Sequence, residues 1–227
     1  MKRSILWNGF ELKKGEISTK IGEVPYIAYT PERTDQVVNI AIHGEGHEKE
    51  DWLCFNSVLK LGNLLKESIK SNSAFIAFDL YGHGEWVINN KNFNIYNLSE
   101  SDKEELIEKS SIAIEEAIPI LLKDENLEDN KLAITAFSLG CSVALGIRTA
   151  NPNLKTVLIS PYPADIRSNC KHYCVIRGSK DAQISTAEFQ DIYNKLPKGT
   201  ILESFDSEHE VPVSWIHHAK EFIYTSV

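Results

Sequence analysis

Ser138 lies where an apolar stretch breaks, at the corner of a predicted strand, turn and helix. Residues 132–136 form the short apolar run of a strand buried on both faces, and apolar residues return at 143, 145 and 147 as a helix. A hydroxyl held at such a corner points out of the sheet, and the amide groups that begin the helix favour negative charge beside it. The position suits a nucleophile, although a serine that caps a helix after a buried strand is a simpler explanation.

The segment 136–140, Ala-Phe-Ser-Leu-Gly, resembles the G-x-S-x-G nucleophile elbow of the α/β-hydrolase family, with Ala136 replacing the first glycine. Small residues are needed there because the strand and helix backbones pass close together, and we expect one added methyl group to fit. Ser138 itself would adopt a strained backbone conformation that costs about 1–3 kcal/mol. The resemblance implies an α/β-hydrolase fold, with a mostly parallel central sheet and helices on both faces.

A serine nucleophile needs a histidine to take its proton and a carboxylate to orient that histidine. In the family, both follow the serine in chain order, each on a loop after a later strand. Asp181, in Gly-Ser-Lys-Asp, and His209, in the loop 206–212, match those positions, so the resemblance implies catalytic roles for Ser138, Asp181 and His209. An ordinary turn aspartate and an exposed loop histidine are the simpler explanations. The weaker candidates are Asp165, after the preceding strand, and His217 and His218, inside the predicted final helix.

The segment His43-Gly44-Glu45-Gly46 follows another predicted strand and resembles the family's H-G-x-G loop, whose backbone N–H groups stabilise an oxyanion. By this resemblance, the backbone N–H groups of Glu45 and Leu139 form the oxyanion hole. We expect His43 to anchor the loop rather than to catalyse.

A metal site is the alternative for this region, because the loops 43–47 and 79–84 follow strands that are expected to be neighbours. Its ligands would be His43, His47, Asp79 and His83. Their spacing matches no metal motif with a known mechanism. The loop 79–84 also resembles a family signature, and glycines there allow tight turns. We therefore expect no metal and no cofactor.

Buried strands alternating with helices predict a parallel sheet for most of the chain. An antiparallel hairpin, with strands at 10–20 and 24–29, is expected to precede it. Further strands are predicted at 37–42, 74–78, 132–136, 155–159, 172–177 and 200–205, and helices at 51–70, 99–116, 139–147, 185–196 and 213–224. Pro119 and the acidic stretch after Lys123 are expected to end the second helix.

Residues 85–98 are rich in aromatic residues and asparagine and have neither strand nor helix periodicity. We expect a single domain, residues 1–227, in which residues 85–98 form a short insertion over the site. The loop 161–171 is too short for the large lid that many members of the α/β-hydrolase family carry, so only this insertion can cover the site. Trp86, Phe93 or Tyr96 would then form an apolar wall of a rather open site, or simply pack onto the sheet.

The composition excludes several classes of protein. A chain of 227 residues with 42% hydrophobic and 25% charged residues is typical of one soluble globular domain. The net charge of −8, without a basic cluster, argues against a nucleic-acid partner. We find neither a signal-peptide core nor an apolar run of the roughly 20 residues that span a bilayer. The four cysteines are scattered and predicted to be reduced, so we expect a cytoplasmic protein.

These features together predict a serine hydrolase that cleaves a small carboxylic ester through an acyl-enzyme intermediate. A thioesterase, a peptidase or an acyltransferase would present the same loops, because the fold determines the acyl chemistry and not the leaving group. A hydrolase-like protein that binds a small ligand without turnover is the alternative from another class. Glu45, Glu48 and Glu85 near the expected mouth either disfavour anionic substrates or form a solvated rim. Nothing in the sequence indicates the oligomeric state.

Overall fold

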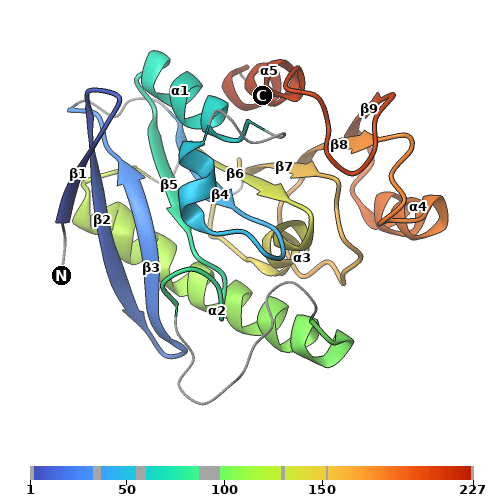
Figure 1. Cartoon of the computed structure of the whole chain (residues 1–227), viewed down its shortest axis with the longest axis horizontal. Coiled ribbons are helices and arrows are strands. Elements are labelled where there is room, and N and C mark those ends of the chain that lie inside the picture. The colour runs from blue at the N-terminus through green and yellow to red at the C-terminus, as the bar shows by residue number, and fades with distance from the viewer. Residues whose placement is uncertain are drawn as a thin grey trace.

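The computed structural model describes residues 3–32, 37–54, 60–86, 98–128, 131–151 and 153–225. Within them, nine strands form one sheet in the order β1-β2-β3-β5-β4-β6-β7-β8-β9 (Figure 1). Its centre consists of parallel strands from buried apolar runs, because a strand covered on both faces has no polar side. These strands are β4 (Val38–Ile42), β5 (Ala74–Phe78), β6 (Leu132–Phe137), β7 (Lys155–Ile159) and β8 (His172–Gly178).

The two edges of the sheet differ. β9 (Ile201–Phe205) continues the parallel pairing beyond β8. At the other edge, β2 (Phe10–Thr19) and β3 (Gly22–Tyr29) form the predicted antiparallel hairpin, and β3 pairs antiparallel with β5. β1 (Arg3–Trp7) lies outside β2 and was not predicted, because this short edge strand has little burial to mark it, and Leu6 is 80% exposed.

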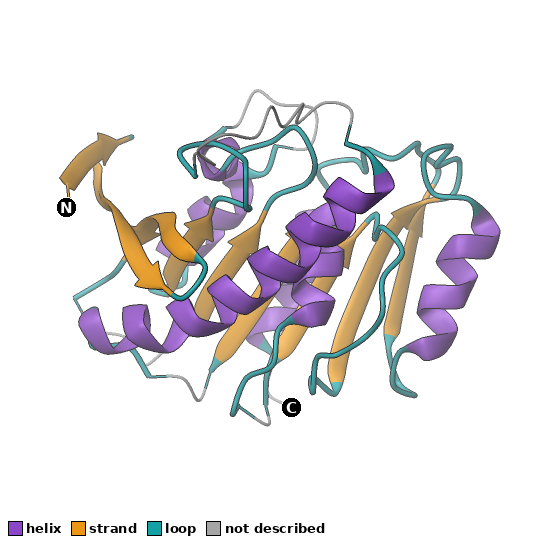
Figure 2. Ribbon diagram, turned by 90° about the horizontal axis from the view of Figure 1, so that it is seen from below, coloured by secondary structure: helices purple, strands orange, loops and turns teal. Residues whose placement is uncertain are grey.

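Helices cover both faces, as expected for an α/β sheet. α1 (Gly62–Lys70) and α5 (Trp215–Tyr224) lie on one face, where Leu64, Leu65 and Trp215 join one apolar core (Figure 1). α2 (Glu100–Asp124), α3 (Leu139–Gly146) and α4 (Thr186–Lys195) lie on the other face and bury their apolar sides in a second core. Figure 2 shows α2 running across the strands on that face. The mostly parallel sheet with helices on both faces is thus confirmed.

Two predicted helices differ from the structure. α2 does not end near Pro119 but continues to Asp124, because buried Leu121 and Leu122 hold its last turns on the core despite the missing proline N–H. In place of one helix at 51–70, the structure has a short 3₁₀ helix, η1 (Lys49–Leu53), and α1. η1 ends at Cys54, whose backbone is extended, and residues 55–59 lie outside the described residues.

Most of the predicted insertion, residues 87–97, also lies outside the described part of the chain. Among the helices of the described part, none combines the length and the apolar character that crossing a bilayer requires. The four cysteines are free thiols, of which Cys54 is exposed and the other three are buried.

Candidate active site

Ser138 occupies the turn between β6 and α3 with φ 51° and ψ −122°, a strained conformation for a residue with a side chain. The turn is tight because the backbone at Ile42 and His43 packs directly against Gly140. A Cβ atom on Gly140 would lie 2.2 Å from the carbonyl oxygen of His43, so only glycine fits there. Ala136, which replaces the first glycine of the motif, is fully buried in the core. The Ser138 hydroxyl is thus held where the strand ends and the helix begins.

The structure brings the side chains of Ser138, His209 and Asp181 together from three separate loops. His209 Nε2 lies 2.9 Å from Ser138 Oγ, and His209 Nδ1 lies 2.8 Å from Asp181 Oδ2. The other carboxylate oxygen, Oδ1, accepts hydrogen bonds from the backbone N–H groups of Gln183 and Ile184, at 2.9 and 3.0 Å. These bonds orient the carboxylate toward Nδ1, which favours the tautomer whose Nε2 accepts the serine proton.

Two residues that the sequence did not single out position the His209 loop. The Ser160 hydroxyl, at the end of β7, donates a hydrogen bond to the carbonyl oxygen of His209 at 2.6 Å. Gly178, at the end of β8, lies against the same loop, where an added Cβ would come within 1.8 Å of the carbonyl oxygen of Glu208. The signal for Gly178 was present in the predicted acid loop, whereas the contact of Ser160 depends on the fold. Both residues thus hold the main chain of the loop that carries His209.

The other candidates from the sequence lie elsewhere. Asp165 lines a groove farther along α2 and is not among the described residues around Ser138. His217 and His218 lie in α5 as predicted, and His218 Nδ1 is 3.3 Å from a carboxylate oxygen of Glu203. Their positions leave His209 as the histidine next to the serine.

The loop 43–46 packs directly against the turn at Ser138, since a Cβ atom on Gly44 would lie 3.0 Å from Cβ of Ser138. Leu139 is the first residue of α3, so its N–H belongs to the helix start, where backbone N–H groups have no partner within the helix. The Glu45 side chain turns toward Leu98 and accepts a hydrogen bond from its backbone N–H at 3.2 Å. This placement is compatible with oxyanion donors at Glu45 and Leu139, which remain a proposal.

Hydrogen bonds between backbone and side chains join the loop 43–49 to the loop 79–85. His43 Nε2 accepts from the N–H of Leu80 at 3.0 Å, and His83 Nε2 accepts from the N–H of Gly46 at 3.2 Å. Burial lowers the pKa of His43 to about 3, so this imidazole is neutral and able to accept. His43 is therefore the anchor that was expected.

A buried ion pair completes this junction. Lys49 Nζ lies 2.6 Å from Asp79 Oδ2, and neither side chain is exposed to solvent. Asp79 also accepts hydrogen bonds from the backbone N–H groups of Lys49 and Glu85, each at 2.9 Å. Burial opposes the charge on Lys49, but Asp79 and Glu85 outweigh it and raise its pKa. Lys49 was not recognised from the sequence, because a lysine among charged residues gives no sign of burial.

These contacts also account for the four residues that were considered as metal ligands. His43 and His83 each accept a hydrogen bond from a backbone N–H group, and Asp79 pairs with Lys49. His47 Nδ1 lies 2.9 Å from Asp51 Oδ2. Within the described ranges, no three His, Cys, Asp or Glu side chains are grouped closely enough to hold a metal ion.

A hollow of about 390 Å³ opens beside Ser138, and we call it the reaction hollow. Its described lining is Glu45, Gly46, His47, Lys103, Phe137, Ser138, Leu139, Tyr162, Gln183, Ile184, His209 and Glu210. Trp86 is not among these residues. It is buried and packs edge-on against Tyr81, with ring centroids 5.6 Å apart, so packing and not a substrate wall is what the structure supports. Phe93 and Tyr96 lie outside the described residues.

No protein-family model and no curated protein sequence matches the chain. Solved structures do match it. An α/β serine hydrolase without a lid from Xanthomonas campestris is 12% identical, with a TM-score of 0.65 over 98% of this chain and 99% of that one. Acetyl xylan esterase 1 from Thermoanaerobacterium is also 12% identical, with a TM-score of 0.72 over 98% and 86%. The Bacillus cereus carboxylesterase is 18% identical, with a TM-score of 0.64 over 88% and 93%. The chain has the α/β-hydrolase fold, as its motifs predicted.

The buried ion pair yields a prediction about stability. Asp79→Asn leaves the Lys49 ammonium buried without its closest anion, and we expect the free energy of unfolding to fall by about 3–5 kcal/mol. Asp191→Asn is the matched control, because it breaks the exposed pair with Lys195 and should cost about 1 kcal/mol or less. Urea denaturation measures both. Equal losses in the two variants would contradict the assigned role of the buried pair.

The burial of His43 leads to a prediction about how the free energy of unfolding depends on pH. The unfolded chain binds a proton at this histidine near its ordinary pKa of 6.5, but the folded chain does so only near 3. Stability should therefore decline as the pH is lowered below about 6.5. His43→Gln keeps an acceptor for Leu80 but does not titrate. We expect the loss of unfolding free energy between pH 7.5 and 5 to be smaller in this variant by about 2 kcal/mol. An unchanged loss, measured by urea denaturation at both pH values, would show that His43 is not the group responsible.

Proposed function

We propose that this protein is a serine hydrolase that cleaves small carboxylic esters through an acyl-enzyme intermediate. The observation that carries the proposal is the hydrogen-bonded series from Ser138 Oγ to His209 and on to Asp181, with distances of 2.9 and 2.8 Å. The series lies at the carboxyl ends of parallel strands, where α/β folds place their ligands. It also begins at a strained corner above the first turn of a helix, which favours developing negative charge.

In the first half of the reaction, His209 Nε2 takes the proton of Ser138 as Oγ attacks the ester carbonyl carbon. The carbonyl oxygen becomes an oxyanion, which the backbone N–H groups of Glu45 and Leu139 stabilise. Asp181 stabilises the imidazolium and keeps its orientation. His209 then protonates the alkoxide oxygen, the alcohol leaves, and the acyl group remains on Ser138.

In the second half, a water molecule gives its proton to His209 and attacks the acyl carbon. The oxyanion forms again in the same hole, and its collapse breaks the bond to Ser138 Oγ. His209 returns the proton to Oγ, and the carboxylic acid leaves. Each proton taken by His209 is given back within the same half-reaction, so no cofactor is needed for the balance of the reaction.

The size and lining of the reaction hollow support a small acyl group. Phe137, Leu139 and Ile184 supply an apolar part, and a volume of about 390 Å³ is at the lower end of the range of ligand pockets. Two of the structural neighbours are named as an acetyl xylan esterase and a carboxylesterase, which is consistent with an ester substrate. Thioesterase, peptidase and acyltransferase activities remain alternatives on the same residues, because the acyl-enzyme is common to all of them.

The proposal predicts that a fluorophosphonate probe labels the protein at Ser138. Ser138→Ala should abolish labelling, and His209→Ala should lower kcat for 4-nitrophenyl acetate by about 10⁴- to 10⁶-fold. Asp181→Asn should cost about 10⁴-fold, because the wrong histidine tautomer is then favoured. Nitrophenyl esters of increasing acyl length measure the capacity of the hollow. A folded protein that neither reacts with the probe nor cleaves any of these esters would favour the non-catalytic binding protein instead.

The contact of Gly178 with the His209 loop gives a second prediction. Gly178→Ala places a methyl group against the carbonyl of Glu208 and must push the loop away from Ser138, so we expect kcat to fall at least tenfold. Gly199→Ala is the control, because it strains a left-handed backbone (φ 94°) remote from the reaction hollow. It should lose stability but keep kcat. If the two variants lost activity equally, the close packing of Gly178 would not be what positions His209.

A further inference from the structure

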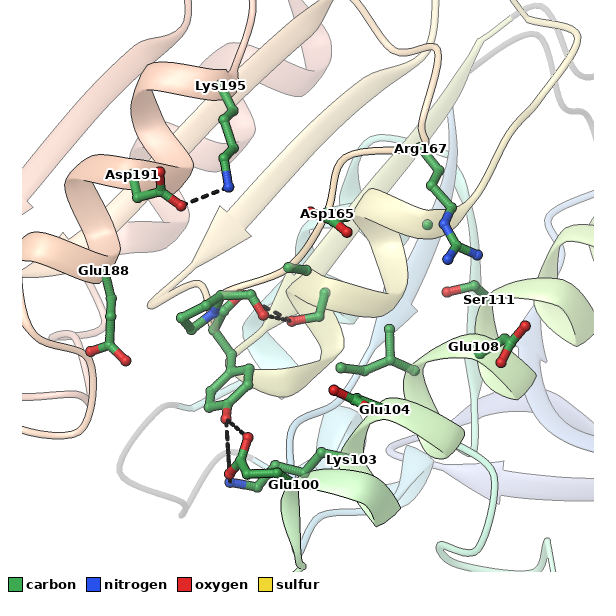
Figure 3. A pocket seen from close by; sticks show the side chains of 16 residues that line it. Glu100, Lys103, Glu104, Glu108, Ser111, Asp165, Arg167, Glu188, Asp191 and Lys195 are labelled. Atoms are coloured by element: carbon green, nitrogen blue, oxygen red, sulfur yellow. Dashed lines mark hydrogen bonds and ion pairs between the residues drawn. The ribbon is translucent and has the colours of Figure 1, made fainter.

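A second, larger hollow of about 630 Å³ lies between α2 and α4, and we call it the acidic groove. In Figure 3, side chains of α2 and α4 face it from opposite sides, and the segment that follows β7 supplies residues between them. The labelled side chains include Glu104 and Glu108 of α2, Glu188 and Asp191 of α4, and Asp165 and Arg167 of the segment between them. None of the steps proposed for ester cleavage uses this groove.

The acidic groove adjoins the reaction hollow, because Lys103 and Tyr162 line both. The backbone N–H of Tyr162 donates to the carbonyl oxygen of Ser138 at 3.3 Å. Lys103 Nζ donates to the Tyr162 hydroxyl at 3.4 Å and to a Glu100 carboxylate oxygen at 3.0 Å. The boundary between the two hollows is thus tied both to the nucleophile and to the start of α2. The two hollows therefore share part of their walls.

The groove carries an excess of negative charge. Six carboxylates and three cationic side chains are present among the described residues that line it. Two of these cations already pair with carboxylates, Lys103 with Glu100 at 3.0 Å and Lys195 with Asp191 at 2.6 Å. The reaction hollow adds Glu45 and Glu210 to the same side of the molecule. Arg167 is the third cation, so the lining keeps an excess of carboxylates over cations. A concave surface with an excess of one sign of charge attracts ligands of the opposite sign.

We propose that the acidic groove is a second subsite of the same active site, which binds a positively charged group of the substrate remote from the reacting carbonyl. The substrate class is then an ester that carries an ammonium group several bonds from its carbonyl carbon. This inference rests on the proposed function. The mostly charged walls also disfavour a long hydrocarbon chain, which would have to desolvate them.

Binding to the Ser138→Ala protein tests the subsite without requiring turnover. Two pairs of ligands match in shape and differ in charge. Acetylcholine and 3,3-dimethylbutyl acetate place the group on the alcohol side, and ethyl 4-(trimethylammonio)butanoate and ethyl 5,5-dimethylhexanoate place it on the acyl side. We expect the cation of at least one pair to bind about tenfold more tightly by calorimetry at low ionic strength, with most of this preference lost in 1 M salt.

The residues responsible are tested by charge removal on one helix. In the Ser138→Ala background, Glu104→Gln with Glu108→Gln should reduce the tenfold preference to threefold or less. Glu105→Gln with Glu116→Gln is the matched control, because it removes the same charge from α2 at residues outside the described lining of the groove, and it should leave the preference unchanged. A preference that is equally reduced in both double variants would reflect net charge and overturn the subsite.

Turnover of 4-nitrophenyl acetate by the unaltered protein separates the two proposals. If the acetate is cleaved but neither pair of ligands shows a charge preference, the subsite is wrong and the hydrolase remains. If the preference exists and depends on Glu104 and Glu108 while the acetate is not cleaved, the groove binds cations and the chemistry assigned to Ser138 is wrong.

Discussion

Close contact between main chains at the carboxyl ends of the central strands is the constraint on which this site depends. The carbonyl oxygen of His43 lies against Gly140, and that of Glu208 lies against Gly178, each too close to admit a Cβ atom. The first contact seats the turn that holds Ser138, and the second seats the loop that holds His209. The loop with His43 follows β4, the turn at Ser138 follows β6, and the His209 loop packs against the end of β8. Since these strands belong to one sheet, all three segments share one support. The strain at Ser138 is sustained by this support and by the buried strand and helix on either side.

Polar groups inside the protein add a second support, which acts on the loops rather than on the strands. His43, His83 and Asp79, which pairs with Lys49, accept hydrogen bonds from backbone N–H groups of the loops 43–49 and 79–85. Burying these groups is costly unless every one of them has a partner, and here they are partnered with one another and with the main chain. These bonds fix the loop 43–49 on the side that faces the loop 79–85. Its residues Glu45, Gly46 and His47 line the reaction hollow.

The parts of this structure that the sequence predicted are those that depend on local pattern and chain order. The buried strands 74–78 and 155–159 were predicted with their observed limits, because the first is apolar throughout and the second ends in an apolar run of β-branched and aliphatic residues. Ser138, Asp181 and His209 were expected to meet because their loops resemble, in chain order, those of the α/β-hydrolase family, and their side chains do meet. Lys49, Ser160 and the extension of α2 past Pro119 were missed, since each depends on contacts with segments distant in the chain.

Each anchor of the site joins a main-chain atom of one segment to a glycine or a polar side chain of another. The carbonyl oxygens of Glu208 and His209 and the N–H groups of Leu80 and Gly46 make their contacts through the main chain, so these contacts need a particular residue only on the partner side, at Gly178, Ser160, His43 and His83. Substitutions can therefore accumulate at most surrounding positions without shifting the reacting atoms. One fold is thus compatible with very different sequences, since the chain shares it with solved hydrolases at 12% identity while no family model matches the chain.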